Sequence, residues 1–63
     1  MQTRDPRIDP QPGDVVKKGK TRRVNHRKGD EVFYMSGGSM VERSCWITTW
    51  QDWCRDAEVL HAA

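Results

Sequence analysis

The sequence predicts one small, mainly β domain, built as an antiparallel meander with one short helix near its C-terminal end. From residue 13 onward, runs rich in β-forming residues alternate with glycine-containing turns. All three tryptophans lie in the last third of the chain, and two of them, Trp50 and Trp53, are spaced to share one face of a helix. A chain of 63 residues has only a thin core, so we expect these large rings to supply much of it.

The first segment, residues 1–12, is predicted to be a flexible arm. Its three prolines and alternating charges prevent a helix and weaken a strand. The turn signal Pro12-Gly13-Asp14 then opens a single small domain over residues 13–63. Val15-Val16 begins the first short strand of this domain, and Gly19 ends it.

A three-stranded meander is predicted next, over residues 20–28, 31–36 and 40–48. The connections, Gly29-Asp30 and Gly37-Gly38-Ser39, are as short as hairpin loops and rich in residues that accept a positive φ. These loops indicate that each strand pairs antiparallel with the next.

The first hairpin loop sets a register for its two strands. With two residues in the loop, the cross-strand pairs are Lys28 with Glu31, His26 with Phe33, and Val24 with Met35. Val24, Phe33 and Met35 then share one apolar face, which we expect to form the core.

The length of the second loop decides which side chains of the third strand join that face. A two-residue loop adds Glu42, Ser44 and Trp46, whereas a three-residue loop adds Val41, Cys45 and Ile47. We favour the three-residue loop because it completes one apolar face. Arg43 has no apolar role there, and we expect it at the rim with its charge in water.

The last elements are a short helix and a closing strand. Thr48, followed three residues later by Gln51, has the spacing of a capping box. Apolar side chains then recur at i, i+3, i+4 and i+7, namely Trp50, Trp53, Cys54 and Ala57. They predict an amphipathic helix of about two to three turns, and residues 58–61 have room for a last strand.

This order of elements, with the opening Pro12-Gly13-Asp14-Val15-Val16 and the glycine after it, resembles the SH3-like small β-barrels of the KOW and Tudor types. The resemblance covers residues 12–61 and implies a small antiparallel barrel. In KOW-like barrels the loop after such an opening leads into a basic strand, as it does here. The helix is longer than the single 3-10 turn usual in that class, so an α+β sheet with one packed helix is the alternative. In size and style the chain also resembles short orphan proteins of bacteriophages and prophages.

Positive charge is concentrated in one segment of the chain. Residues 17–28 hold seven Lys and Arg side chains and no acid, whereas the residues before and after them carry net negative charge. The net charge of +2 therefore hides a basic first half and an acidic second half. A basic strand can neutralise phosphates and release counterions, and Arg adds bidentate phosphate contacts.

In the favoured register Tyr34 and Trp46 lie on the face opposite the core, together with Arg23 and Arg27. Exposed aromatic rings beside arginines are typical of surfaces that hold single-stranded nucleic acid. The chain is therefore predicted to be a non-catalytic module that contacts RNA or DNA. The candidate binding residues are Lys17, Lys18, Lys20, Arg22, Arg23, Arg27, Lys28, Tyr34 and Trp46.

Two other interpretations of the same residues stay open. The basic side chains can serve only to solvate a β surface, with Trp46 packed under the arm or the helix. Alternatively, the chain is a protein-interaction module or a small regulator or inhibitor of phage type. Its partner then meets the basic strand or an acidic surface formed by Asp52, Asp56 and Glu58.

Catalysis, metal binding and membrane insertion are not expected. No Ser or Cys lies in the sequence context of a nucleophile, and His26, Cys45, Cys54 and His61 lack the close spacing of a zinc site. The cysteines are expected as buried thiols, although a disulfide between them is conceivable. No apolar run is long enough for a membrane span and no secretory signal is recognised, so we expect a cytoplasmic protein without a cofactor.

Overall fold

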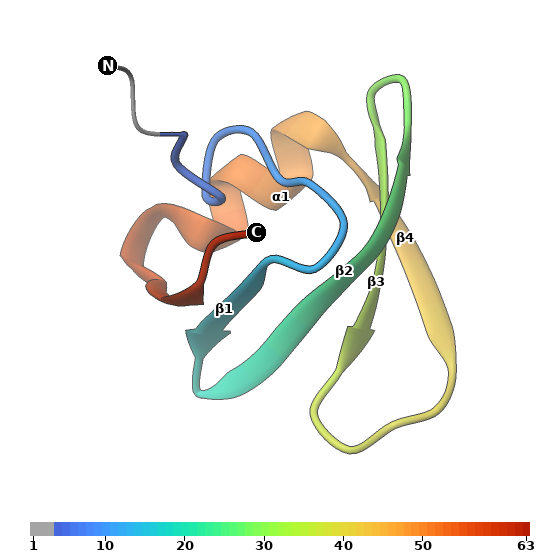
Figure 1. Cartoon of the computed structure of the whole chain (residues 1–63), viewed down its shortest axis with the longest axis vertical. Coiled ribbons are helices and arrows are strands. Elements are labelled where there is room, and N and C mark those ends of the chain that lie inside the picture. Colours follow the sequence, from blue (N-terminus) through green and yellow to red (C-terminus); the bar gives the residue numbers. More distant parts are fainter. Residues whose placement is uncertain (1–3) are drawn as a thin grey trace.

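The computed structural model describes residues 4–63, which form five strands and one short helix (Figure 1). The strands are β1 (Val15–Lys18), β2 (Lys20–Lys28), β3 (Glu31–Ser36), β4 (Glu42–Trp46) and β5 (Glu58–His61). The helix α1 (Ile47–Trp53) continues into a single 3-10 turn, η1 (Cys54–Asp56). The predicted mainly β domain with one short C-terminal helix is thereby confirmed.

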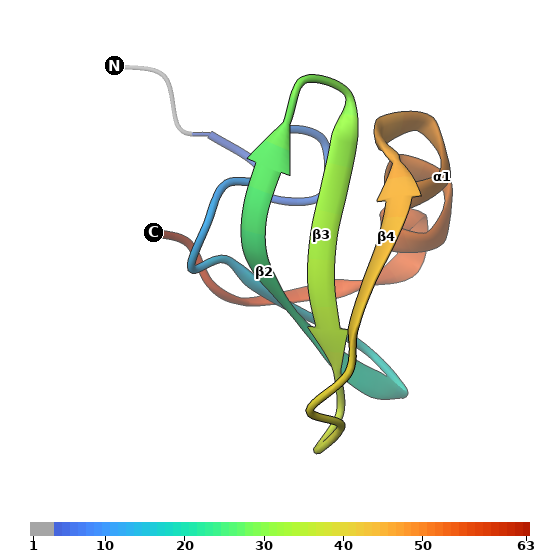
Figure 2. The same cartoon turned by 90° about the vertical axis from the view of Figure 1, so that its right-hand side faces the viewer.

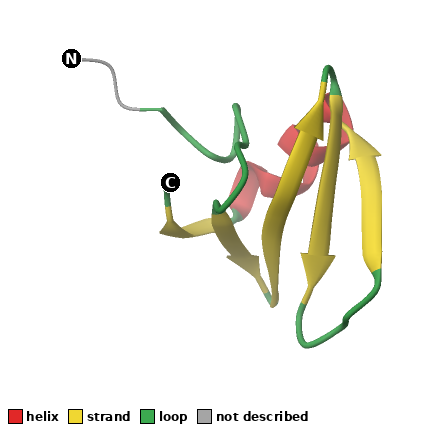
Figure 3. Cartoon of the chain, turned by 45° about the vertical axis from the view of Figure 1, so that its right-hand side comes forward, coloured by secondary structure: helices red, strands yellow, loops and turns green. Residues whose placement is uncertain are grey.

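The strands form one open antiparallel sheet in the order β4-β3-β2-β1-β5, and this sheet does not close into a barrel. Its two edges are β4 and β5. Figure 2 shows α1 beside β4 and partly behind it, so the helix lies on one side of the sheet. We call the face toward α1 the inner face and the opposite one the outer face; Figure 3 shows the helix on one side of the sheet.

The hydrophobic core lies between the inner face and α1. Trp50 of α1 is fully buried, and its indole Nε1 donates a hydrogen bond to the carbonyl oxygen of Pro6 at 3.0 Å. Trp53, on the same face of the helix, is only partly buried. The buried apolar side chains are Val16, Val24, Val32, Tyr34, Trp50, Cys54 and Ala57. Three of the four residues on the predicted helix face are therefore core residues.

A β-bulge at Asn25 changes the predicted register of the first hairpin. The two pairs nearest the loop are as predicted, Lys28 with Glu31 and His26 with Phe33. Beyond the bulge, Val24 lies opposite Tyr34 instead of Met35. One extra residue in a strand shifts every later pair by one position.

This shift exchanges the faces of several side chains, because successive residues of a strand point to opposite sides. Val24 joins Val32 and Tyr34 on the inner face. The prediction that Phe33 and Met35 belong to the core was therefore wrong, since both lie on the outer face.

The connection between β3 and β4 is longer than predicted and spans residues 37–41. Met40 and Val41 lie in it and are exposed, so the prediction of Val41 in the core was also wrong. Cys45 and Ile47 do pack against the core, as predicted. Arg43 is exposed on the edge strand β4, opposite Tyr34.

The helix α1 begins at Ile47 without the predicted capping box. Trp46 is the N-cap residue, and no side chain in residues 4–63 caps this end. Gln51, the predicted partner of Thr48, instead donates a hydrogen bond to the carbonyl oxygen of Ile8 at 2.8 Å.

Within residues 4–63, no helix is long and apolar enough to cross a membrane.

The described part of the predicted arm, residues 4–12, lies against α1 and the end of the chain. Asp14 is a fully buried carboxylate that joins these parts. It accepts hydrogen bonds from the Arg4 guanidinium, from the backbone N–H of Gln11 at 2.7 Å and from that of Ala63 at 2.8 Å. Arg4 also donates to the carbonyl oxygen of Ala63 at 2.8 Å, so the first and the last described residues meet at Asp14.

Candidate anion-binding pocket

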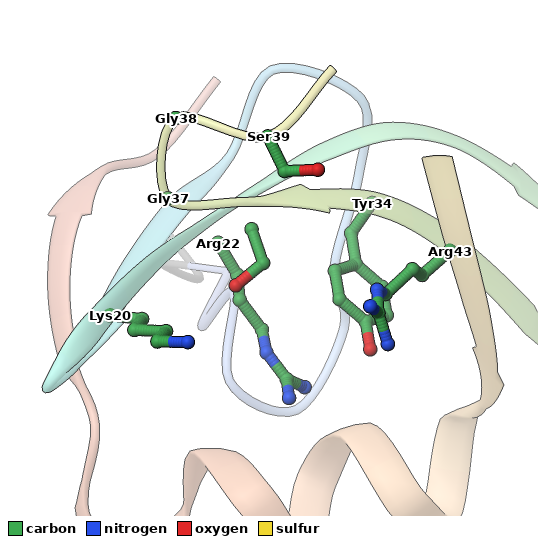
Figure 4. A pocket seen from close by; sticks show the side chains of 8 residues that line it. Lys20, Arg22, Tyr34, Gly37, Gly38, Ser39 and Arg43 are labelled. Atoms are coloured by element: carbon green, nitrogen blue, oxygen red, sulfur yellow. The ribbon is translucent and has the colours of Figure 1, made fainter. Parts of the chain in front are cut away.

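A hollow opens on the inner face near the turn from β3 into β4 (Figure 4). Its volume is about 510 Å³, which lies in the range of small-ligand sites. Within residues 4–63, no acidic side chain lines it. The lining residues are Lys20, Arg22, Tyr34, Ser36, Gly37, Gly38, Ser39 and Arg43. We call this hollow the basic pocket.

Arg22 of β2 is the most constrained cation of the basic pocket. Its guanidinium carbon lies 4.5 Å from the ring centroid of Tyr34 and 3.8 Å from that of Trp53. The sheet supplies the first ring and the end of α1 supplies the second, so the two layers of the fold hold the guanidinium together. Within the described residues, Arg22 pairs with no carboxylate. Its N–H groups are therefore available to an external anion.

Lys20 and Arg43 add two further positive charges to the basic pocket. Both side chains are exposed, and neither forms an ion pair within residues 4–63. Figure 4 shows the Lys20 amine on one side of Arg22 and the Arg43 guanidinium beside the ring of Tyr34 on the other. A cleft whose charges share one sign focuses the electric field, so the pocket attracts anions.

Hydroxyl groups complete the walls of the basic pocket. Ser36 and Ser39 line it from β3 and from the connection that follows, and Figure 4 shows the Tyr34 hydroxyl pointing away from the sheet beside the guanidinium of Arg43. Backbone hydrogen bonds fix the connection: Gly37 N–H donates to the carbonyl oxygen of Thr21 at 2.6 Å, and Ser39 N–H to that of Ser36 at 3.1 Å. Gly37 has a φ of +58°, a conformation that glycine adopts readily. The Ser39 hydroxyl thus stands on a defined turn, and those of Tyr34 and Ser36 stand on β3.

The structure divides the predicted nucleic-acid-binding residues between the two faces of the sheet. Lys20, Arg22 and Tyr34 line the basic pocket. Lys18 lies near them, with its Nζ 5.9 Å from the ring centroid of Trp53 and 3.2 Å from the Trp53 carbonyl oxygen. The predicted residues on the outer face are Lys17, Arg23, Lys28 and Trp46.

Tyr34 does not lie on the face that the sequence predicted. Because of the bulge at Asn25, its ring points into the core and Tyr34 is only 7% exposed. Trp46 is 64% exposed on the outer face, as predicted. The two rings lie on opposite faces of the sheet, so they cannot form one stacking surface.

Arg27 holds the chain together instead of facing a ligand. Its Nη1 donates to the Asp9 carboxylate at 2.7 Å and to the Pro10 carbonyl oxygen at 3.1 Å, and its Nη2 donates to the Gly29 carbonyl oxygen at 2.9 Å. These bonds tie the N-terminal segment to the β2–β3 turn. The charge of Arg27 is therefore balanced within the chain.

The outer face carries both signs of charge and a partly exposed aromatic pair. His26 stacks on Phe33 with ring centroids 4.2 Å apart, and its Nδ1 lies 3.4 Å from a carboxylate oxygen of Glu42. Asn25 donates a hydrogen bond to the same oxygen at 3.2 Å. A polyanion on this face would meet Glu31 and Glu42 as well as the basic residues, so the basic pocket suits it better.

Arg43 and Trp53 belong to the basic pocket or contact it, but the sequence did not identify them as site residues. One feature of the sequence pointed to Arg43: it is a charged residue between Val41 and Cys45, on a strand face that was predicted to be apolar. Trp53 was predicted to belong to the core from its helical spacing. Its contact with Arg22 joins two distant segments, which no local pattern reveals.

Cys45 and Cys54 are free thiols in the structure. Burial raises the pKa of the Cys54 thiol to about 11, so this thiol stays neutral and weakly nucleophilic at neutral pH. Burial also raises the pKa of Cys45. Among residues 4–63, no three His, Cys, Asp or Glu side chains are grouped so that they could hold a metal ion.

Comparison of the chain with models of protein families, with curated proteins and with solved structures found no match. The function proposed below therefore rests on the geometry of the chain itself.

Proposed function

We propose that this chain is a non-catalytic binding module that holds the phosphate backbone of a single-stranded nucleic acid in the basic pocket. One observation carries the proposal: Arg22 is fixed over Tyr34 and Trp53 but pairs with no carboxylate in residues 4–63. A cation partly removed from water is costly unless an anion balances it. The planar fork of an arginine also matches a phosphate with two parallel hydrogen bonds.

Charge around the basic pocket favours a polymeric anion over an isolated small one. Lys18 is exposed at the end of β1 and extends the positive surface beyond Lys20. A nucleic-acid strand with regularly spaced phosphates can contact the basic pocket and Lys18 at once and release counterions. A pocket of about 510 Å³ admits part of one strand. A cytoplasmic location, where both thiols stay reduced, is part of this proposal.

Fluorescence anisotropy with a labelled single-stranded oligonucleotide tests the proposal. Arg43→Gln should weaken binding about tenfold and reduce the log–log salt slope by about one, because one phosphate contact is lost. Arg43 is exposed, so this variant keeps the fold. Arg55→Gln removes the same charge from an exposed residue outside the pocket and should leave affinity within about twofold.

Two results would contradict the proposal. Equal affinities of the Arg43→Gln and Arg55→Gln variants would mean that the basic pocket is not the binding site. A wild-type chain that binds no oligonucleotide at low salt would exclude nucleic acid as the ligand.

A second candidate function, docking of a protein partner, is favoured by Trp46. Its large apolar ring is 64% exposed on the outer face, at the end of the edge strand β4. Exposed aromatic residues are enriched at protein interfaces. If the chain is a small regulator or inhibitor, we expect its partner to meet Trp46 and not the acidic surface near the helix. The charge of Asp52 on that acidic surface is already balanced by Arg55 at 2.9 Å. Under this alternative, Trp46→Ser abolishes partner binding and Arg43→Gln does not.

A further inference from the structure

The basic pocket offers more positive charge than a phosphate inside a strand requires. Lys20, Arg22 and Arg43 line the pocket, and no acid from residues 4–63 lies among them. A phosphodiester in a nucleic-acid strand contributes a single negative charge. A phosphate monoester carries about −1.5 to −2 at pH 7. Three cations are therefore matched better by a monoester.

The hydrogen-bond donors of the basic pocket point to the same ligand. A phosphate monoester presents three strong acceptor oxygens, more than a phosphodiester can offer. Arg22 and Arg43 each supply a fork of N–H donors, and Lys20 supplies an ammonium group. The hydroxyl groups of Tyr34 and Ser39 lie on two further walls. These donors reach the basic pocket from several strands. They can therefore bind the three oxygens of a phosphate monoester, which point in different directions.

Two parts of the fold bound the basic pocket. Strands β2, β3 and β4 supply one side, and the connection of residues 37–41 bounds the pocket where β3 leaves the sheet (Figure 4). This connection is held by the hydrogen bond from Gly37 N–H to the Thr21 carbonyl oxygen.

We infer that the basic pocket binds the terminal phosphate of a single nucleic-acid strand. This inference rests on the proposed function and adds that the chain recognises a phosphorylated end. Arg22 contacts two oxygens of the terminal phosphate through its fork, and Arg43 and Lys20 balance its second charge. Lys18 lies beside Trp53, where the next phosphate of the strand can reach it.

Oligonucleotides of one sequence, with an internal fluorophore and differing only at their ends, test this inference. One has hydroxyl groups at both ends, one has a 5′-phosphate and one a 3′-phosphate. The wild-type chain should bind one of the phosphorylated oligonucleotides about tenfold or more tightly than the unphosphorylated one. This preference should disappear in the Arg43→Gln and Lys20→Gln variants, both of which alter exposed side chains, and should persist in Arg55→Gln.

The outcomes separate this inference from the proposed function. Salt-sensitive binding of all three oligonucleotides with equal affinity would overturn the terminal phosphate and leave the proposed function intact. Failure to bind any of them would overturn both. A nucleoside monophosphate that competes as strongly as the phosphorylated oligonucleotide would also overturn the inference, since the ligand would then be a free nucleotide and not a strand end.

Discussion

Arg22 is held in a different way from the other anchored arginines of the chain. Arg4, Arg7 and Arg27 each pair with a carboxylate, whereas Arg22 stacks over two aromatic rings. Such contacts stabilise a cation by about 0.5–2 kcal/mol and leave its hydrogen-bond donors unused. An arginine held by rings is therefore prepared for a ligand, while one held by a carboxylate is already neutralised.

The Arg22→Lys substitution tests the role of the guanidinium at the residue scale. Lysine keeps the charge but has neither the planar fork nor the flat surface that stacks on Trp53. We expect oligonucleotide affinity to fall about tenfold and the free energy of unfolding to fall by about 1 kcal/mol. Anisotropy and urea titration measure the two quantities. Wild-type affinity in this variant would show that only the charge of Arg22 matters.

Asp14 links the stability of the chain to pH. Burial alone raises the pKa of its carboxyl, but hydrogen bonds from Arg4, Ala63 and Gln11 outweigh burial and hold the pKa below its ordinary value of 3.8. The unfolded chain therefore binds this proton more tightly than the folded chain does. The stability contributed by Asp14 is full above the ordinary pKa and is lost as the pH falls through the folded-state pKa.

The Asp14→Asn variant should unfold with a free energy about 1–3 kcal/mol lower than the wild type at pH 7. Below about pH 4 the difference between the two proteins should shrink, because protonation removes the charge of Asp14 in the wild type. Asp5, whose pKa Arg7 also lowers, is present in both proteins and does not affect the comparison. Urea unfolding between pH 7 and pH 2 measures this difference. A constant difference over the whole range would contradict the role of the Asp14 charge.

At the scale of elements, local signals in the sequence were enough to predict the order of strands and helix. Glycine turns and helical spacing are short-range features, and they identified the meander, α1 and the closing strand. The bulge at Asn25 has no such signal, since nothing in its neighbours marks an extra residue. It moved Tyr34 into the core and Phe33 out of it. Gln51 bonds to Ile8 instead of capping the start of α1, and a local pattern cannot predict this long-range contact.

Trp50 joins the elements of the domain and supplies a stability prediction. It is fully buried between the sheet and the N-terminal segment. Trp50→Ala should cost about 3–5 kcal/mol, which equals the whole stability expected of a domain this small. Trp53→Ala should cost less, because Trp53 is only partly buried. Two-dimensional amide NMR spectra report the outcome, and native-like shift dispersion in Trp50→Ala would contradict this account of the core.

For the whole molecule, the sequence identified a basic segment. It did not predict on which face of the sheet each basic side chain lies or which of them pair with acids. Strand alternation and the bulge send Arg22 to the inner face and Arg23 to the outer face. Arg27 is neutralised by Asp9, and Arg43 arrives from a strand outside the basic segment. The candidate site is thus assembled from parts of the chain that meet only after folding. Composition predicts a tendency to bind anions, and tertiary structure selects the pocket.

An amide NMR titration of the wild-type chain with a single-stranded oligonucleotide, at low and at moderate salt, shows whether nucleic acid binds in the basic pocket. We expect salt-sensitive shifts at residues 18–22 and 34–39, at Arg43, and at the indole of Trp53, which stacks on Arg22. The outer-face residues Arg23, His26 and Trp46 should change little. Shifts confined to the outer face, or no shifts at low salt, would contradict the assignment of the basic pocket as a nucleic-acid-binding site.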